Sequence, residues 1–117
     1  MAYMSAETAK KIRNALKEAF PEFKFSVRKP DSLSLRVAVL SGPLDFSALK
    51  HSDINQYHLD MYRELGDEQY EFLKKVNDII HSAGDYYDKS DMSSDYFNVA
   101  FYYSIRIGDY DKPYNQV

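Results

Sequence analysis

The chain has 117 residues, 44% of them hydrophobic and 28% charged, a size and balance that allow one well-formed core. It contains no cysteine, which excludes disulfides, thiolate metal sites and cysteine nucleophiles. Its net charge of -3 is divided unevenly: residues 1–50 carry nine Lys/Arg and five Asp/Glu, whereas residues 51–117 carry six and thirteen. The acidic total argues against non-specific nucleic-acid binding, and the length predicts a single domain over residues 1–117.

The first element is an amphipathic helix. Ser5 has the hydroxyl of a typical N-cap, which can accept a hydrogen bond from an amide of the first turn. Apolar residues then recur at helical spacing, namely Ala9, Ile12, Leu16 and Ala19. Pro21 disfavours the helical conformation in the residue before it, so we expect the helix to end there.

The pattern then changes to strict alternation, which is typical of strands with one buried face. Phe23, Phe25 and Val27 form one apolar row. A second row consists of Leu33, Leu35, Val37 and Val39. The residues between the rows, 29–32, contain proline, aspartate and serine, which favour turns. The segment therefore predicts a β-hairpin.

Residues 44–66 are harder to interpret. Residues 45–50 are compatible with a helical turn, and residues 54–59 with a short third strand. A second helix follows, because acidic residues at 67 and 68 suit a helix start. Its apolar stripe consists of Phe72, Leu73, Val76, Ile79, Ile80 and Ala83. Gly84 is a natural stop for this helix.

A polar loop over residues 85–95 leads to the clearest strand pattern. Alternate residues from Phe97 to Ile107 are apolar or aromatic and point to one side. The predicted fold is therefore α+β in the order α-β-β-(β)-α-β. We expect an antiparallel or mixed sheet of three to four strands, with both helices on its apolar face.

No pattern of catalytic or metal-binding residues is found. The three histidines, His51, His58 and His81, lack the spacing of a helical metal site. Asp88, Asp91 and Asp95 lack the spacing and glycine of a calcium loop. The four glycines form no phosphate-binding loop. We therefore expect a protein that is not an enzyme and uses no metal or cofactor.

The most suggestive surface is acidic and rich in tyrosine. Residues 60–95 hold ten Asp/Glu against four Lys/Arg, and seven of the eleven tyrosines follow Gly84. Carboxylates attract a basic partner over a distance, and tyrosine adds contact area at modest entropic cost. The predicted partner-binding residues are Asp85, Tyr86, Tyr87, Asp88, Asp91, Asp95, Asp109 and Asp111. The alternative is a nucleic-acid-binding surface on the basic first half, which includes Lys10, Lys11, Arg13 and Lys17.

Several runs of residues resemble a known family. The longest is Ser5-Ala-Glu-Thr-Ala-Lys-Lys-Ile-Arg-Asn-Ala-Leu-Lys-Glu-Ala-Phe-Pro-Glu-Phe-Lys-Phe-Ser-Val-Arg. The others are Leu33-Ser-Leu-Arg-Val, Ile54-Asn-Gln-Tyr, Asp91-Met-Ser-Ser-Asp-Tyr-Phe-Asn-Val and Asp109-Tyr-Asp-Lys-Pro. Together they are similar to a small α+β large polyvalent protein associated domain. The likeness spans most of the chain and is strongest in its first third.

The resemblance implies an accessory protein of a phage or mobile element, such as an inhibitor of CRISPR or restriction immunity. The implied partner is a host defence protein or ribonucleoprotein with a basic surface. Direct nucleic-acid binding is the less favoured reading. The sequence has no stretch long and apolar enough for a membrane span and no signal-peptide pattern, so we expect the protein in the host cytoplasm.

Overall fold

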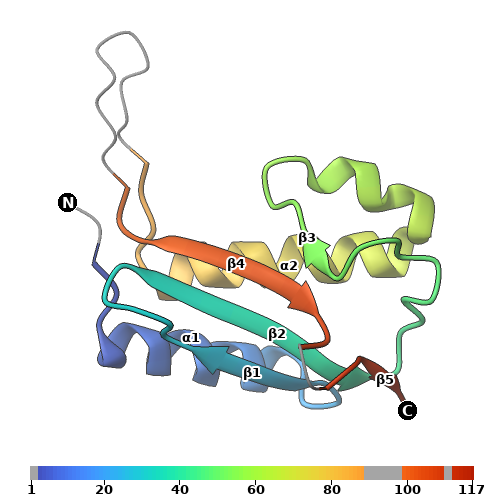
Figure 1. The fold of residues 1–117 in the computed structure, drawn as a ribbon, viewed down its shortest axis with the longest axis horizontal. Helices are drawn as coiled ribbons and strands as arrows, with labels where there is room; N and C mark the ends of the chain where they lie inside the picture. Colours follow the sequence, from blue (N-terminus) through green and yellow to red (C-terminus); the bar gives the residue numbers. More distant parts are fainter. Residues whose placement is uncertain (1–2, 89–98, 110–111) are drawn as a thin grey trace, which may run out of the picture.

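The computed structural model describes residues 3–88, 99–109 and 112–117. These residues form one layer of sheet covered by helices (Figure 1). The elements are α1 (Ala6–Ala19), β1 (Lys24–Arg28), β2 (Ser34–Gly42), β3 (Asp53–Ile54), the 3₁₀-helix η1 (Leu59–Leu65), α2 (Asp67–Ala83), β4 (Tyr102–Ile107) and β5 (Asn115–Gln116). This arrangement confirms the predicted α+β class.

The sheet is mixed, with the strand order β1-β2-β4-β3. The long strand β2 runs antiparallel to β1 and parallel to β4, and β3 is antiparallel to β4. The short strand β5 pairs with β2 at Ser41 and Gly42. The described residues thus form five strands, one more than the sequence predicts. The extra strand has only two residues, too few to produce a recognisable alternation.

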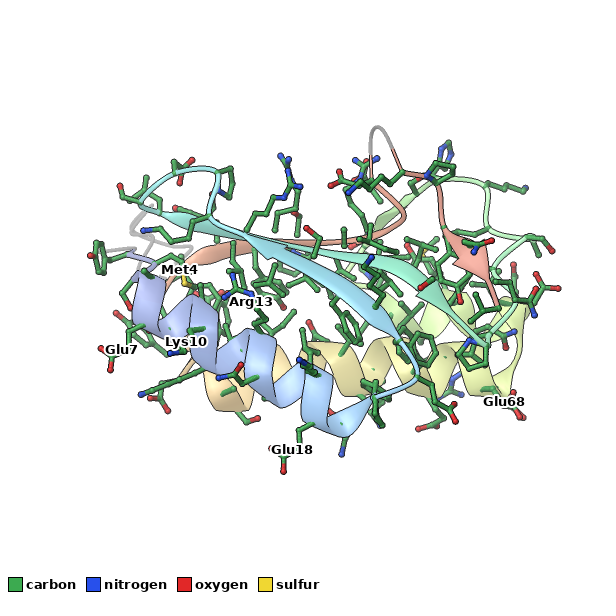
Figure 2. All side chains as sticks on the ribbon, turned by 90° about the horizontal axis from the view of Figure 1, so that it is seen from below. Met4, Glu7, Lys10, Arg13, Glu18 and Glu68 are labelled. Carbon is green, nitrogen blue, oxygen red and sulfur yellow. The ribbon has the colours of Figure 1, made fainter. Side chains whose placement is uncertain are left out.

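Both long helices lie on the same face of the sheet (Figure 2). Helix α1 begins where expected, because the Ser5 hydroxyl accepts a hydrogen bond of 3.0 Å from the Thr8 amide. It ends at Ala19, two residues before Pro21, and buries Ala9, Ile12 and Leu16. Helix α2 buries the predicted stripe from Phe72 to Ile80.

The core lies between the helices and the inward face of β2 and β4. Val37, Val39 and Ile105 have no exposed surface, and Ile107 is buried beside them. Phe101, directly before β4, is 2% exposed and belongs to the same face. A β-carbon on Gly84 would lie 2.9 Å from the Phe101 ring and 3.0 Å from Ile12, so this glycine allows α2 to pack closely at that point.

Two predictions about the elements need correction. The third strand covers only Asp53 and Ile54, and the chain then enters η1 instead of extending to residue 59. The last strand begins at Tyr102, and Val99 contributes only an isolated bridge to Asp88. Phe97, the predicted first residue of that strand, lies outside the described residues. The orientation of the alternation is nevertheless right, because Phe101, Ile105 and Ile107 face the helices.

Replacing Phe101 by Ala should lower the free energy of unfolding by about 3–5 kcal/mol, because it removes a large ring from a closely packed core. Urea denaturation followed by circular dichroism measures this loss. Tyr102→Ala is the matched control, since its neighbouring ring points to the other face and is 52% exposed. A loss below about 1 kcal/mol for Phe101→Ala would contradict the packing described above.

Candidate functional site

The candidate site lies where α2 ends and β4 begins, and its geometry starts with the helix terminus. Asp85 has a positive φ of 50°, a conformation that aspartate tolerates better than most residues. The Tyr86 amide donates to the His81 carbonyl at 2.9 Å, which is the six-to-one bond of a Schellman terminus. Gly84 itself is in a right-handed conformation, so Asp85 and not Gly84 makes the turn.

This helix terminus places Tyr86 flat against His81. Their rings are 4.5 Å apart with an interplanar angle of 26°. Tyr86 also meets Phe101 and Tyr103 edge-on, at 5.2 and 5.4 Å. Contacts between the residue after a Schellman turn and the last helical turn are common. Here they fix a tyrosine that bridges the core and the surface.

A chain of hydrogen bonds connects α2 to β4 beneath Tyr86. The Tyr103 hydroxyl donates to Asn77 Oδ1 at 2.6 Å, and His81 Nε2 lies 2.7 Å from the same hydroxyl. The Tyr103 phenol has a single proton, which it donates to Asn77. His81 must therefore donate to the phenol oxygen through a protonated Nε2. Gln56 Nε2 donates to the Tyr103 carbonyl at 2.8 Å and anchors the β3–η1 connection to the same strand.

Burial shifts the pKa values of this cluster in the direction that keeps each side chain uncharged. It raises the pKa of the Tyr103 phenol well above its usual value, and that of Tyr86 in the same direction. Burial lowers the pKa of His81 below its ordinary value, and the nearby Asp78 carboxylate opposes this only in part. The phenols therefore stay protonated and the imidazole stays neutral at neutral pH.

Three further tyrosines are exposed around the cluster. Tyr57 is 74% exposed, Tyr102 52% and Tyr87 38%. Tyr57 and Tyr102 are close enough to Tyr86 to raise its pKa, as is Asp88. Tyr87 is held by a hydrogen bond of 2.9 Å from the Ala100 amide to its carbonyl. We call the group of Asp85, Tyr86, Tyr87, Asp88, Tyr57 and Tyr102 the tyrosine–aspartate surface.

The structure brings only some of the predicted partner-binding residues together. Asp85, Tyr86, Tyr87 and Asp88 are consecutive and lie at the start of β4 (Figure 1). Asp109 follows the end of β4, and its backbone exchanges paired hydrogen bonds with that of Lys112. A six-residue strand separates the two groups by roughly 20 Å. The other three predicted residues, Asp91, Asp95 and Asp111, lie outside the described residues.

Six residues of this region were not among the predicted site residues, namely Gln56, Tyr57, Asn77, His81, Tyr102 and Tyr103. Asn77 and His81 are four positions apart in the sequence, which places them on one face of a helix, and this spacing was an available signal. Tyr57 and Tyr102 gave no comparable signal, because their proximity depends on how the β3–η1 connection lies against β4.

The described part of the chain contains no group of three His, Asp or Glu side chains arranged to hold a metal ion. None of the helices within residues 3–88, 99–109 and 112–117 is long and apolar enough to cross a membrane.

The fold defines a small α+β domain in which two helices cover one face of a mixed sheet. Residues 3–105 match the family model described as large polyvalent protein associated domain 29, and the chain belongs to that family. The family associates the chain with phages and mobile elements. No curated protein and no solved structure shows significant similarity to it.

The polar cluster generates a prediction about pH. In the folded protein the pKa of His81 lies below 6.5, its ordinary value, so unfolding takes up a proton as the pH falls. The neutral His81 side chain therefore makes its full contribution to the stability of the fold above pH 6.5. This contribution is lost progressively as the pH falls further. The melting temperature of the natural chain should fall between pH 7.5 and pH 5. The melting temperature of the His81→Gln variant should fall less. The glutamine amide can still donate a hydrogen bond to Tyr103, but it does not titrate.

Two comparisons test the assignment to His81. His51→Gln, at an exposed position, should retain the pH profile of the natural chain. Asp31 and Asp45, whose pKa values are lowered below 3.8 by hydrogen bonds from Leu33 and Ser47, affect stability only in more acidic solution. Identical profiles for His81→Gln and the natural chain would show that His81 does not control stability in this range.

Proposed function

We propose that the domain is a non-enzymatic binding protein of a phage or mobile element that inhibits a host defence complex. Its target is a CRISPR or restriction complex, and it acts by occupying a basic, nucleic-acid-binding surface. The observation that carries this proposal is the tyrosine–aspartate surface, where exposed phenol rings adjoin Asp85 and Asp88 at one end of the sheet.

The chemistry of this surface suits protein recognition. A tyrosine ring contributes a large contact area while losing little side-chain entropy, and its hydroxyl can still donate and accept hydrogen bonds. Carboxylates beside such rings speed the encounter with a basic partner and orient it. The carboxylates resemble the negative charges of a nucleic acid, and the tyrosine rings add apolar contact that phosphates lack.

The packing beneath the surface supports a preformed binding site. Tyr86 contacts His81, Phe101 and Tyr103, so its ring has little freedom to lose when a partner binds. Rigid anchors of this kind reduce the entropic cost of association.

The same cluster argues against an enzyme. A catalytic base would have to accept a proton from its nucleophile, but the Tyr103 phenol donates to Asn77 and not to His81. Burial also raises the pKa of that phenol, which makes it a poor nucleophile. The cluster is better explained as a rigid support for the exposed rings.

A plating assay tests the proposal. Expression of the domain should raise the plating efficiency of a targeted phage in a host with an intact defence system, and should have no effect in an isogenic host lacking that system. Affinity purification from the protected host, read by mass spectrometry, should recover a subunit of the defence complex. Equal plating in both hosts would contradict the proposal.

Neutralising Asp88 of the tyrosine–aspartate surface together with Asp91 and Asp95, the next two aspartates in the sequence, tests whether this acidic segment binds the partner. Asp88→Asn, Asp91→Asn and Asp95→Asn together should leave the melting temperature nearly unchanged, because aspartates are seldom buried and asparagine is similar in size. Binding to the purified target should weaken and lose much of its salt dependence. The control neutralises Lys10, Lys11 and Arg13. If that variant alone lost binding, the working surface would lie on the first helix.

The alternative function, a nucleic-acid-binding accessory domain, is favoured by a groove of about 290 Å³ beside β1. Its lining, which we call the basic groove, consists of Arg13, Lys17, Phe23, Lys24 and Phe25. Arg13 is positioned by a hydrogen bond of 2.8 Å from Nη2 to the Val27 carbonyl. Cations can neutralise phosphates, and half-exposed aromatic rings can stack on bases.

Fluorescence anisotropy with a single-stranded oligonucleotide at two salt concentrations separates the two functions. Tight binding that weakens steeply with salt and is lost in Lys17→Gln/Lys24→Gln would favour the alternative. The proposed function predicts weak oligonucleotide binding that this double variant barely changes.

A further inference from the structure

A second surface lies on the helix side of the molecule, between the end of α1, the start of α2 and the segment after β2. It is a shallow depression of about 510 Å³. Its apolar lining consists of Phe20, Phe23, Pro43, Leu44 and Phe72, and its polar lining of Glu22, Glu68, Glu71 and Lys75. We call it the aromatic depression. It shares no residue with the tyrosine–aspartate surface.

The floor of the aromatic depression is closely packed. Phe23 stacks on the buried Phe72 at 4.2 Å with an interplanar angle of 20°, and Phe20 meets Phe72 edge-on at 4.8 Å. A β-carbon on Gly42 would lie 2.1 Å from the Phe23 ring, so only glycine lets this ring lie against β2. Phe20, Phe23 and Leu44 remain partly exposed although they pack on the core. An apolar side chain could therefore dock without a large rearrangement of the floor.

The rim carries three exposed carboxylates and one ammonium group. Helix stability accounts for Glu68, because an acid in the first turn of α2 is favourable with the helix dipole. It does not account for Glu22, which follows the C-terminal end of α1, where the dipole favours a cation. Within the described residues Glu22 and Glu68 form no ion pair, and Glu71 acts weakly on Arg63 by raising its pKa. Folding alone thus leaves the acidic rim unexplained.

We propose that the aromatic depression binds a protein segment that inserts an apolar side chain and carries Lys or Arg on either side of it. The phenylalanine floor supplies the apolar contact, and the three carboxylates select for flanking positive charge. The same carboxylates repel phosphates, which disfavours a nucleic acid at this position. This surface is independent of the tyrosine–aspartate surface, so the proposal does not rest on inhibition of a defence complex.

The experiment uses three labelled synthetic peptides and the full chain. One peptide is an amphipathic pattern of Leu and Lys, the second replaces Lys by Glu, and the third replaces Leu by Ser. Fluorescence anisotropy should show binding of the Leu/Lys peptide alone. Neutralising the rim with Glu22→Gln, Glu68→Gln and Glu71→Gln should weaken that binding at least tenfold.

The matched control removes three negative charges elsewhere, with Glu7→Gln, Asp60→Asn and Asp78→Asn. All three residues are exposed, and Figure 2 shows Glu7 at the opposite end of the helix layer from Glu68. The control should bind the Leu/Lys peptide within twofold of the natural chain. Melting curves of both triple variants confirm that they are folded.

Several results would overturn the proposal. Equal losses in the two triple variants would mean that only the overall charge attracts the peptide. Binding of the Ser/Lys peptide as tight as that of the Leu/Lys peptide would show that the apolar floor is not used. A concentration-dependent dimer, seen by light scattering and abolished by the rim variant, would assign the depression to a second copy of the chain.

Discussion

The parallel pairing of β2 with β4 is the constraint on which the rest of the structure depends. Two parallel neighbours cannot be joined by a tight turn, because the chain must return to the end of the sheet at which the first strand began. Here the return falls between Gly42 and Tyr102, and α2 runs back along the sheet within that segment (Figure 1). The C-terminal end of α2 must therefore lie beside the N-terminal end of β4.

That constraint determines where the acidic residues lie. The residues directly after α2 meet the residues directly before β4, because Asp88 forms a bridge with Val99 and the Tyr86 ring packs against the buried Phe101. Asp109 follows β4 at the other end of the sheet, where its backbone pairs with that of Lys112. A single acidic rim made from both groups would require the chain to double back along β4. The charge of the second half is consequently divided between two ends of the molecule.

Periodicity in the sequence was sufficient for the long elements and failed for the short ones. Helix α1 and strand β2 could be predicted, because Ser5 caps a regular apolar stripe and residues 33–39 alternate without interruption. Strands β3 and β5 have two residues each, and η1 is a 3₁₀-helix of seven, so none contains enough repeats to reveal a period. The candidate site was incompletely predicted for the same reason, because Tyr57 lies near Tyr86 only as a result of the path of the β3–η1 connection.

The net charges of the two sequence halves are also a poor guide to the surface. Phe23 lines both the basic groove and the aromatic depression, so the cations of α1 and β1 and the carboxylates of the depression lie on adjoining surfaces. At physiological salt a charge acts over about 8 Å, so the electrostatic fields of two surfaces that share a residue overlap where they meet. A polyanion following the basic groove past Phe23 would enter the field of Glu22 and Glu68. A folded protein, which carries both signs of charge within a few ångströms, meets no such conflict, and this favours protein recognition at this end of the domain.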